Sequence, residues 1–240
     1  MKWWFYFLLI AFPLTGGIIG YYANLSKKLN IKLVLAFAGA YLLSVVLFHL
    51  IPHIYTEANV LSGALLLAGF FFQVYLEKFS RGVEHGHLHI HQHGKPNKLI
   101  PYEILVSLSL HSFMEGMPLG SGLLNADGSQ LSFLFGIVSH EMPAAFAMVS
   151  ILKASHVKPK LLQWFVVIYA SMSAMGAGIS ALLKDAVNEH VFEYLMAFVV
   201  GTFLHIATTI LFENSENHRF SASKVLAIIG GIALAAFVSI

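Results

Sequence analysis

The chain has 240 residues, of which 58% are hydrophobic and 11% charged, with a formal net charge of +2 and a mean hydropathy of +0.75. A soluble domain is about a quarter charged, so this composition excludes an ordinary soluble protein, and the small net charge predicts no nucleic-acid partner. The chain contains no cysteine, which excludes disulfides, thiolate metal sites and cysteine nucleophiles. Any bound metal must therefore be held by nitrogen and oxygen.

A helix that crosses the hydrocarbon core of a bilayer needs about 20 predominantly apolar residues. Eight segments meet this requirement, and they predict an all-α integral membrane protein, an eight-transmembrane-helix bundle in which residues 1–240 form a single domain. The first could also be a signal peptide, but no A-x-A-like cleavage site follows it, and we interpret it as a spanning helix. In chain order the segments are 3–23, 31–53, 59–79, 99–124, 131–153, 160–183, 193–213 and 222–240.

The distribution of basic residues predicts the orientation of this bundle. Twelve of the 14 lysines and arginines flank the connections after the first, third, fifth and seventh spans, whereas the opposite side carries only Lys2 and Lys184. Cytoplasmic loops carry the excess of Lys and Arg. Both termini are therefore expected to be extracytoplasmic, and the histidine-rich connection 84–98 is expected to be cytoplasmic.

Polar residues interrupt two of the predicted spans. His111 and Glu115 are four residues apart in the fourth span and so share one helix face, and His140 and Glu141 are adjacent in the fifth. Ionisable residues at bilayer depth are costly and usually mark an ion or proton path, and two imidazoles with one or two carboxylates suit zinc, iron or manganese. These residues predict one shared metal site between two helices; the alternative is a His–Glu hydrogen bond that only joins the helices.

Further histidines extend the set of candidate ligands. His49 near the outer end of the second span could line an entrance, and His205 in the middle of the seventh could be a ligand, a proton carrier or a hydrogen-bonded packing residue. The polar loop contains five alternating histidines, a composition typical of loose metal binding. They are His85, His87, His89, His91 and His93.

The chain resembles the ZIP (Zrt-, Irt-like) metal transporters over nearly its full length. The fourth-span segment H-S-F-M-E-G is similar to the family's H-N-x-x-[DE]-G, and H-E-M-P in the fifth is similar to the first part of H-E-x-P-H-E. H-L-I-P in the second span and G-T-F-L in the seventh also match, as do the eight spans and the histidine-rich loop.

The resemblance implies metal ligands at His111, Glu115 and His140, and it matches Glu141 to the family's second, adjoining metal site. Three departures bear on that second site. Ser112 replaces the usual Asn, Ala144–Ala145 replace the usual His-Glu, and the span 160–183 has no carboxylate. We therefore expect one metal site, completed by Glu141, His205, His49 or water.

The predicted function is transport of a divalent metal into the cytoplasm by alternating access, without a prosthetic group. Zn²⁺ is the expected cargo, with Fe²⁺, Mn²⁺ and Cd²⁺ as alternatives, and the expected location is the plasma membrane, which is the inner membrane of a Gram-negative cell. The sequence is compatible with a homodimer. One alternative is a transport-inactive family member that binds or senses metal. Another is an intramembrane metalloprotease, but its H-E-x-x-H signature lacks the second histidine here, where Ala144 stands.

Overall fold

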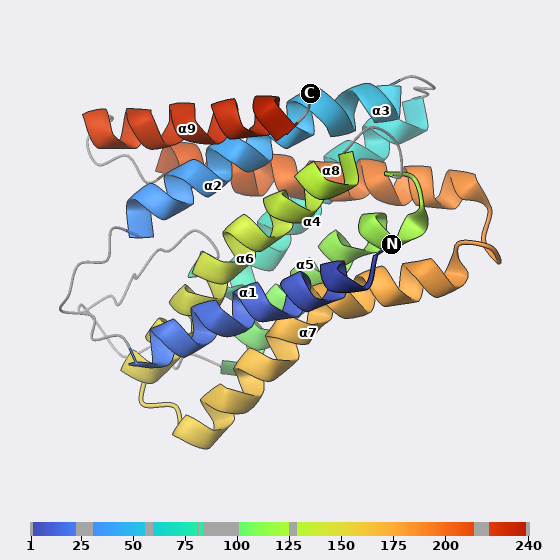
Figure 1. Cartoon of the computed structure of the whole chain (residues 1–240). Coiled ribbons are helices and arrows are strands. Elements are labelled where there is room, and N and C mark those ends of the chain that lie inside the picture. The colour runs from blue at the N-terminus through green and yellow to red at the C-terminus, as the bar shows by residue number, and fades with distance from the viewer. Residues whose placement is uncertain are drawn as a thin grey trace.

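The protein is described by a computed structural model that covers residues 2–22, 31–55, 60–80, 82–83, 101–124, 129–213 and 221–238. These residues are almost entirely helical (Figure 1). The helices are α1 (Trp3–Tyr22), α2 (Ile31–Val45), η1 (Val46–Leu50), α3 (Ile51–Tyr55), α4 (Val60–Ser80), α5 (Pro101–Ser121), α6 (Ser129–Ala154), α7 (Pro159–Leu183), α8 (Glu189–Glu213) and α9 (Ala222–Val238).

The second predicted span is one continuous helix with a π-helical turn in its second half. The turn η1 joins α2 to α3 without a break, and the backbone N–H of Ile51 donates to the carbonyl of Val46, five residues earlier. Pro52 follows directly, and because proline has no N–H, it removes one hydrogen bond of the regular α-helical pattern. Counted as one helix, α2–η1–α3 brings the long helices of the described residues to eight, which confirms the predicted bundle.

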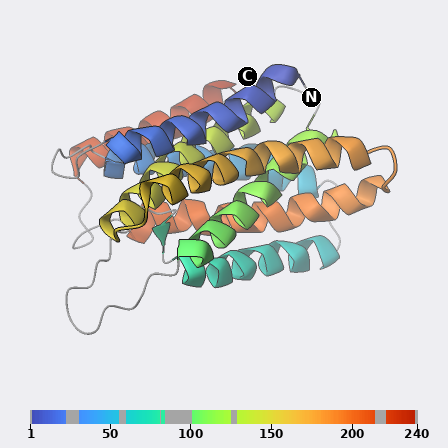
Figure 2. The same ribbon diagram turned by 90° about the horizontal axis from the view of Figure 1, so that it is seen from below.

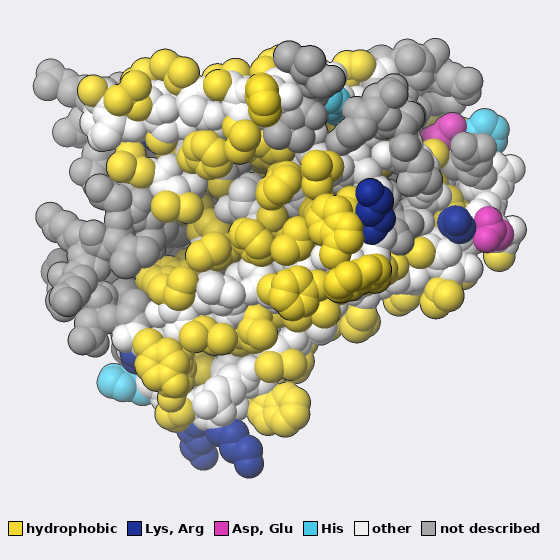
Figure 3. All heavy atoms as spheres, viewed as in Figure 1, with side chains coloured by type: hydrophobic (Ala, Val, Ile, Leu, Met, Phe, Trp, Pro, Cys, Tyr) yellow, Lys and Arg dark blue, Asp and Glu magenta, His cyan; other side chains and the backbone are white. Residues whose placement is uncertain are grey.

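Each predicted span matches one of these helices, with both ends within four residues. Six of the described helices are long and apolar enough to cross a membrane. Of the other two, α5 has 21 residues but carries the polar residues of the predicted site, and α9 is an apolar helix of 17 residues. Hydrophobic side chains cover the middle of the face seen in Figure 3, and charged side chains lie toward its ends. The molecule is therefore a multi-pass membrane helical bundle.

The connections alternate between the two ends of the bundle. In Figure 1, α1 begins and α7 gives way to α8 toward the right, α9 runs from the left toward the middle, and α6 turns into α7 at the lower left. Both termini thus lie on the same side, as an even number of spans requires. The extracytoplasmic assignment of that side remains a prediction from the basic residues, and the domain assignment 1–240 also remains a prediction.

The bundle is built from four pairs of closely packed helices. α5 packs most extensively on α7, α1 on α6, α4 on α8 and α2 on α9. In the α5–α7 pair, a Cβ on Gly116 would overlap the carbonyl oxygen of Ser173, and a Cβ on Gly176 would overlap that of Phe113. Small residues allow helix backbones to approach closely in lipid. Gly116 and Gly176 therefore allow the backbones of α5 and α7 to lie in close contact.

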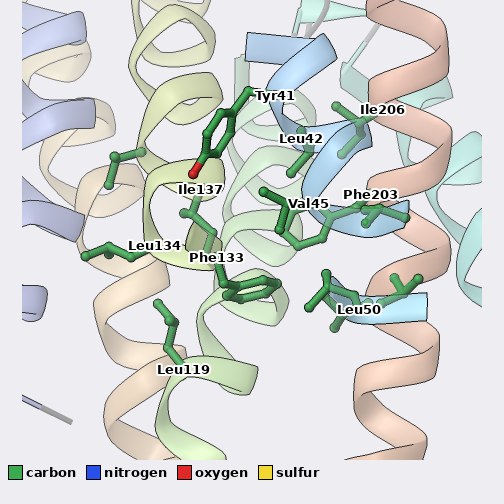
Figure 4. Close-up of a cluster of buried hydrophobic side chains, with 14 of the residues drawn as sticks. Tyr41, Leu42, Val45, Leu50, Leu119, Phe133, Leu134, Ile137, Phe203 and Ile206 are labelled. Atoms are coloured by element: carbon green, nitrogen blue, oxygen red, sulfur yellow. The ribbon is translucent and has the colours of Figure 1, made fainter. Parts of the chain in front are cut away.

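The pairs form two groups. In the first set, α7 packs on α1, α5 and α6, and α6 also packs on α1 and α5. In the second set, α8 packs on α2 and α4, and α9 packs on α2. Taken in total, contacts between the two sets are less extensive than contacts within them. Figure 2 shows α4 against α8 at one edge and α1 at the opposite edge. Buried side chains from both groups meet at the boundary, including Tyr41 of α2, Phe133 and Ile137 of α6 and Phe203 of α8 (Figure 4).

Candidate metal centre

Three buried side chains from two helices converge in the interior of the bundle. His111 and Glu115 lie one turn apart on α5, and His140 lies on α6. All three are at most 3% exposed. Glu115 stands between the two rings: its Oε1 is 2.9 Å from Nε2 of His111, and its Oε2 is 2.9 Å from Nε2 of His140. The structure thus brings together the three residues that the i,i+4 spacing and the resemblance selected.

The surroundings of His140 leave one ring nitrogen directed at Glu115. Nδ1 of His140 lies 2.7 Å from the carbonyl oxygen of Gly136, which can only accept a hydrogen bond, so Nδ1 carries a proton. Nε2 then faces a second acceptor, the Glu115 carboxylate. Two acceptors at this distance need either a proton or a cation between them. A backbone carbonyl that fixes the far nitrogen of a histidine is a common support for a metal ligand.

His111 is a buried ring without a hydrogen bond. Neither of its ring nitrogens, nor Oε1 of Glu115, has a hydrogen-bond partner among the described residues, although Nε2 and Oε1 are close. The two atoms are near each other but are not aligned as donor and acceptor. Buried polar atoms are nearly always satisfied, and an unsatisfied one costs about 1–3 kcal/mol. A cation held by both atoms would remove that cost.

The three ligand atoms are of the kinds that zinc binds, and their separations are close to those around a tetrahedral zinc ion. One ligand atom from each of the three residues lies within 4.8 Å of the other two. Tetrahedral zinc with ligands at about 2.0–2.1 Å needs neighbouring ligand atoms about 3.3 Å apart. Small side-chain rotations therefore suffice to complete three of the four positions. The ring of Phe203 on α8 packs edge-on against His140, with 5.9 Å between ring centroids, so the group lies beside the boundary between the two helix sets.

Glu141 does not belong to this three-residue group. Its Oε1 accepts a hydrogen bond from the hydroxyl of Ser112 on α5, and its Oε2 accepts one from the hydroxyl of Ser173 on α7 at 3.1 Å. The carboxylate is fully buried, and both oxygens are occupied by neutral donors. Ser112, one of the departures from the family motif, is therefore a direct partner of Glu141.

His205 and His49 also lie outside the group. Nε2 of His205 on α8 is 2.7 Å from Oε2 of Glu77 on α4, and its ring packs edge-on against Phe70. His49 lies in the π-helical turn η1 and is partly buried. The five loop histidines, His85 to His93, lie outside the described residues.

Sequence reasoning missed several partners of these side chains. Ser173 and Phe203 belong to helices whose contact with the site follows from tertiary packing, and no local pattern signals them. Glu77 did carry a signal, because it is a carboxylate within a predicted apolar span and such residues are rare. The signal for η1 was Pro52, which follows His49 by three residues.

The chain is similar to known proteins over the region that contains these residues. The profile of the family described as ZIP zinc transporter matches residues 81–239, which is more than half of the chain and includes α5 and α6. The chain belongs to the ZIP zinc transporter family. This family is one of transporters, not of enzymes. Ala144, where a metalloprotease would need its second histidine, is buried among apolar side chains.

Individual relatives are distant. The chain is 28% identical to protein zntD of Dictyostelium discoideum over 159 residues, which are 59% of this chain and 22% of zntD. It is 25% identical to zinc transporter ZIP1 of Danio rerio over 86% of this chain and 78% of that protein, and 26% identical to zinc transporter ZIP9 of Micropogonias undulatus over 65% and 52% respectively. The chain thus spans about a fifth of zntD and about half of ZIP9.

Proposed function

We propose that this ZIP family member carries Zn²⁺ through the membrane into the cytoplasm, one ion at a time, on a site made of His111, Glu115 and His140. The observation that carries the proposal is the Glu115 carboxylate held 2.9 Å from Nε2 of each of two buried histidines. Each of those nitrogens can present a lone pair, and a divalent cation is the ligand that two imidazoles and one carboxylate share most favourably.

One ion per chain is favoured by the environment of Glu141. A second ion beside the first would need this carboxylate, but both of its oxygens accept hydrogen bonds from serine hydroxyls. The positions where relatives carry a further His-Glu pair are Ala144 and Ala145, which are buried in apolar packing. A mononuclear site with three protein ligands leaves the fourth position of a tetrahedral ion to water, and such a site can release its ion more readily.

The position of the three ligands suits alternating access. They belong to the helix set α1, α5, α6 and α7, and His140 contacts Phe203 of the other set. Movement of one set against the other would expose the site first to one face and then to the other. The inward direction rests on the resemblance to the ZIP transporters, and the predicted orientation places the basic connections on the cytoplasmic side. The ligands bind metal only when deprotonated, so transport should fall at low pH.

The test is ⁶⁵Zn²⁺ uptake into proteoliposomes together with zinc stoichiometry of the purified protein. His111→Ala and His140→Ala should each abolish uptake, and the wild type should bind one ion. His190→Ala is the matched control, because His190 also contacts a glutamate, Glu193, but both are exposed at the start of α8. Two tightly bound ions per wild-type chain would overturn the single-site proposal, and unchanged uptake in both site variants would overturn the site itself.

The second candidate is a family member that binds zinc without transporting it, and the Ala144–Ala145 replacement favours it. The same experiment separates the two functions. Stoichiometric zinc binding that depends on His140, with no uptake of Zn²⁺, Fe²⁺, Mn²⁺ or Cd²⁺ by the wild type, would support the sensor. Uptake above that of empty liposomes would exclude it.

A further inference from the structure

A groove on the outside of the bundle is lined by none of the three proposed ligands, so the metal site does not explain it. It lies between the end of α1 and the beginning of α7, which pack side by side, and encloses about 200 Å³. Its walls are mainly apolar. They include Gly17 and Ile18 of α1 and Leu162, Val166 and Val167 of α7.

The groove extends from the membrane surface into the outer part of the acyl-chain region. Its lining runs from Leu14 to Tyr22 on α1 and from Leu162 to Val167 on α7. At 1.5 Å per residue, it extends about 12 Å along α1 from the helix end. Tyr21 and Tyr22 stand at that end, and Tyr22 is exposed. Tyrosines at helix ends are typical of the membrane–water interface, so the open end of the groove lies at headgroup level.

Three basic residues lie at this end of α6 and α7. Lys153 at the end of α6 donates a hydrogen bond to the carbonyl of Tyr21 and stands 5.7 Å from the centre of its ring. Lys158 and Lys160 flank the first residue of α7, and all three lysines are exposed. Figure 3 shows basic side chains gathered at the lower tip of the molecule, where α7 begins in Figure 1.

No acidic residue offsets this charge in the sequence of the contributing segments. The chain has no Asp or Glu before Glu57, and none between Glu141 and Asp185. The first segment includes all of α1, and the second includes the end of α6 and all of α7. The groove therefore combines an apolar trough at acyl-chain depth with basic residues at its open end, and the nearest acidic residue on a neighbouring helix is Glu103 in the first turn of α5.

We propose that this groove binds one anionic glycerophospholipid, with an acyl chain along α1 and α7 and the phosphate at the lysine rim. The glycerol and headgroup hydroxyls would meet Gln163, the exposed polar residue of the lining. Because α1 and α7 belong to the helix set that carries the metal ligands, a lipid here contacts the set whose movement the proposed function requires. The binding proposal itself does not depend on zinc transport.

The test is native mass spectrometry of the full chain without zinc, in the presence of phosphatidylglycerol or phosphatidylcholine with the same acyl chains. The wild type should retain phosphatidylglycerol over phosphatidylcholine. The double variant Lys158→Gln/Lys160→Gln should lose that preference by about 10-fold or more, since each lysine near anionic lipid contributes about 1 kcal/mol, or about fivefold. Lys184→Gln, at the other end of α7, is the charge control and should retain it.

A second pair of variants tests the groove itself. Ile18→Trp should fill the trough and reduce retention of both lipids, whereas Leu226→Trp on α9, which is also a lipid-exposed position, should leave retention unchanged. Equal retention of the two lipids by the wild type, or an equal loss in Lys184→Gln, would overturn the proposal. Displacement of the lipid by inorganic phosphate at matched concentration would also overturn it, because the site would then recognise the anion alone. Size-exclusion profiles and melting temperatures of each variant, compared with those of the wild type, check that the variant is folded.

Discussion

The substitution Glu115→Gln tests the metal centre most directly, because this one carboxylate contacts both histidines. Glutamine keeps the shape of the side chain but removes its charge and turns one of its two acceptor oxygens into an amide donor. That amide would face Nε2 of His111 or of His140. The variant should therefore remain folded while zinc binding weakens sharply.

The expected change in the zinc-dependent Tm shift can be calculated from the loss of zinc affinity. Zinc at 100 times its dissociation constant stabilises a protein by about 2.7 kcal/mol, which for a chain of this size raises Tm by about 5–11 °C. Loss of an outer-shell partner of a metal ligand already lowers affinity by about 10–100-fold, and Glu115 is one of three proposed ligands. A 100-fold loss would reduce the stabilisation to about 0.4 kcal/mol, and the Tm shift to about 1–2 °C.

The assay is thermal unfolding of the purified protein in detergent, with and without zinc. Glu193→Gln is the control, because Glu193 also contacts a histidine, His190, but at an exposed site at the start of α8. The control should keep the full zinc-dependent shift. A full shift in Glu115→Gln, or an equal loss in Glu193→Gln, would refute the assignment of Glu115 as a ligand.

Three further substitutions test the surroundings of the site. Ser173→Ala removes the hydroxyl donor to Oε2 of Glu141 and should lower stability by about 1.5–3 kcal/mol, measured by thermal unfolding, while zinc stoichiometry stays at one. Gly116→Ala should destabilise the α5–α7 pair by about 1–3 kcal/mol, because its Cβ overlaps a backbone carbonyl, whereas Gly178→Ala makes only an ordinary contact and should leave Tm nearly unchanged; equal melting temperatures would contradict the packing. His205→Ala should leave the binding of one zinc ion intact, since His205 pairs elsewhere; loss of that ion in calorimetric titration would place His205 in the site.

The number and limits of the helices could be predicted from the sequence. A bilayer requires about 20 apolar residues per span and tolerates no unsatisfied backbone, so hydropathy and turn residues define each helix locally. The pairing of His111 with Glu115 was also predictable, because residues four apart on a helix share a face. The contact of this pair with His140 was expected from the resemblance, and the structure gives its geometry.

The roles of the remaining candidates depend on contacts between distant segments. Glu141 is adjacent to His140 in sequence, yet it points to Ser173 of α7, because neighbouring residues on a helix face about 100° apart. His205 is paired with Glu77, which lies 128 residues away. No periodicity in either segment could indicate this partner.

The sequence by itself thus determined a membrane bundle of eight helices with a His/Glu metal motif, because composition, span length and i,i+4 spacing are local properties. Only the tertiary structure decided the geometry in which His111, Glu115 and His140 meet, that Glu141 and His205 have other partners, and that a groove with basic residues at one end opens between α1 and α7. These features arise where helices pack, and packing depends on which surfaces meet across the whole chain.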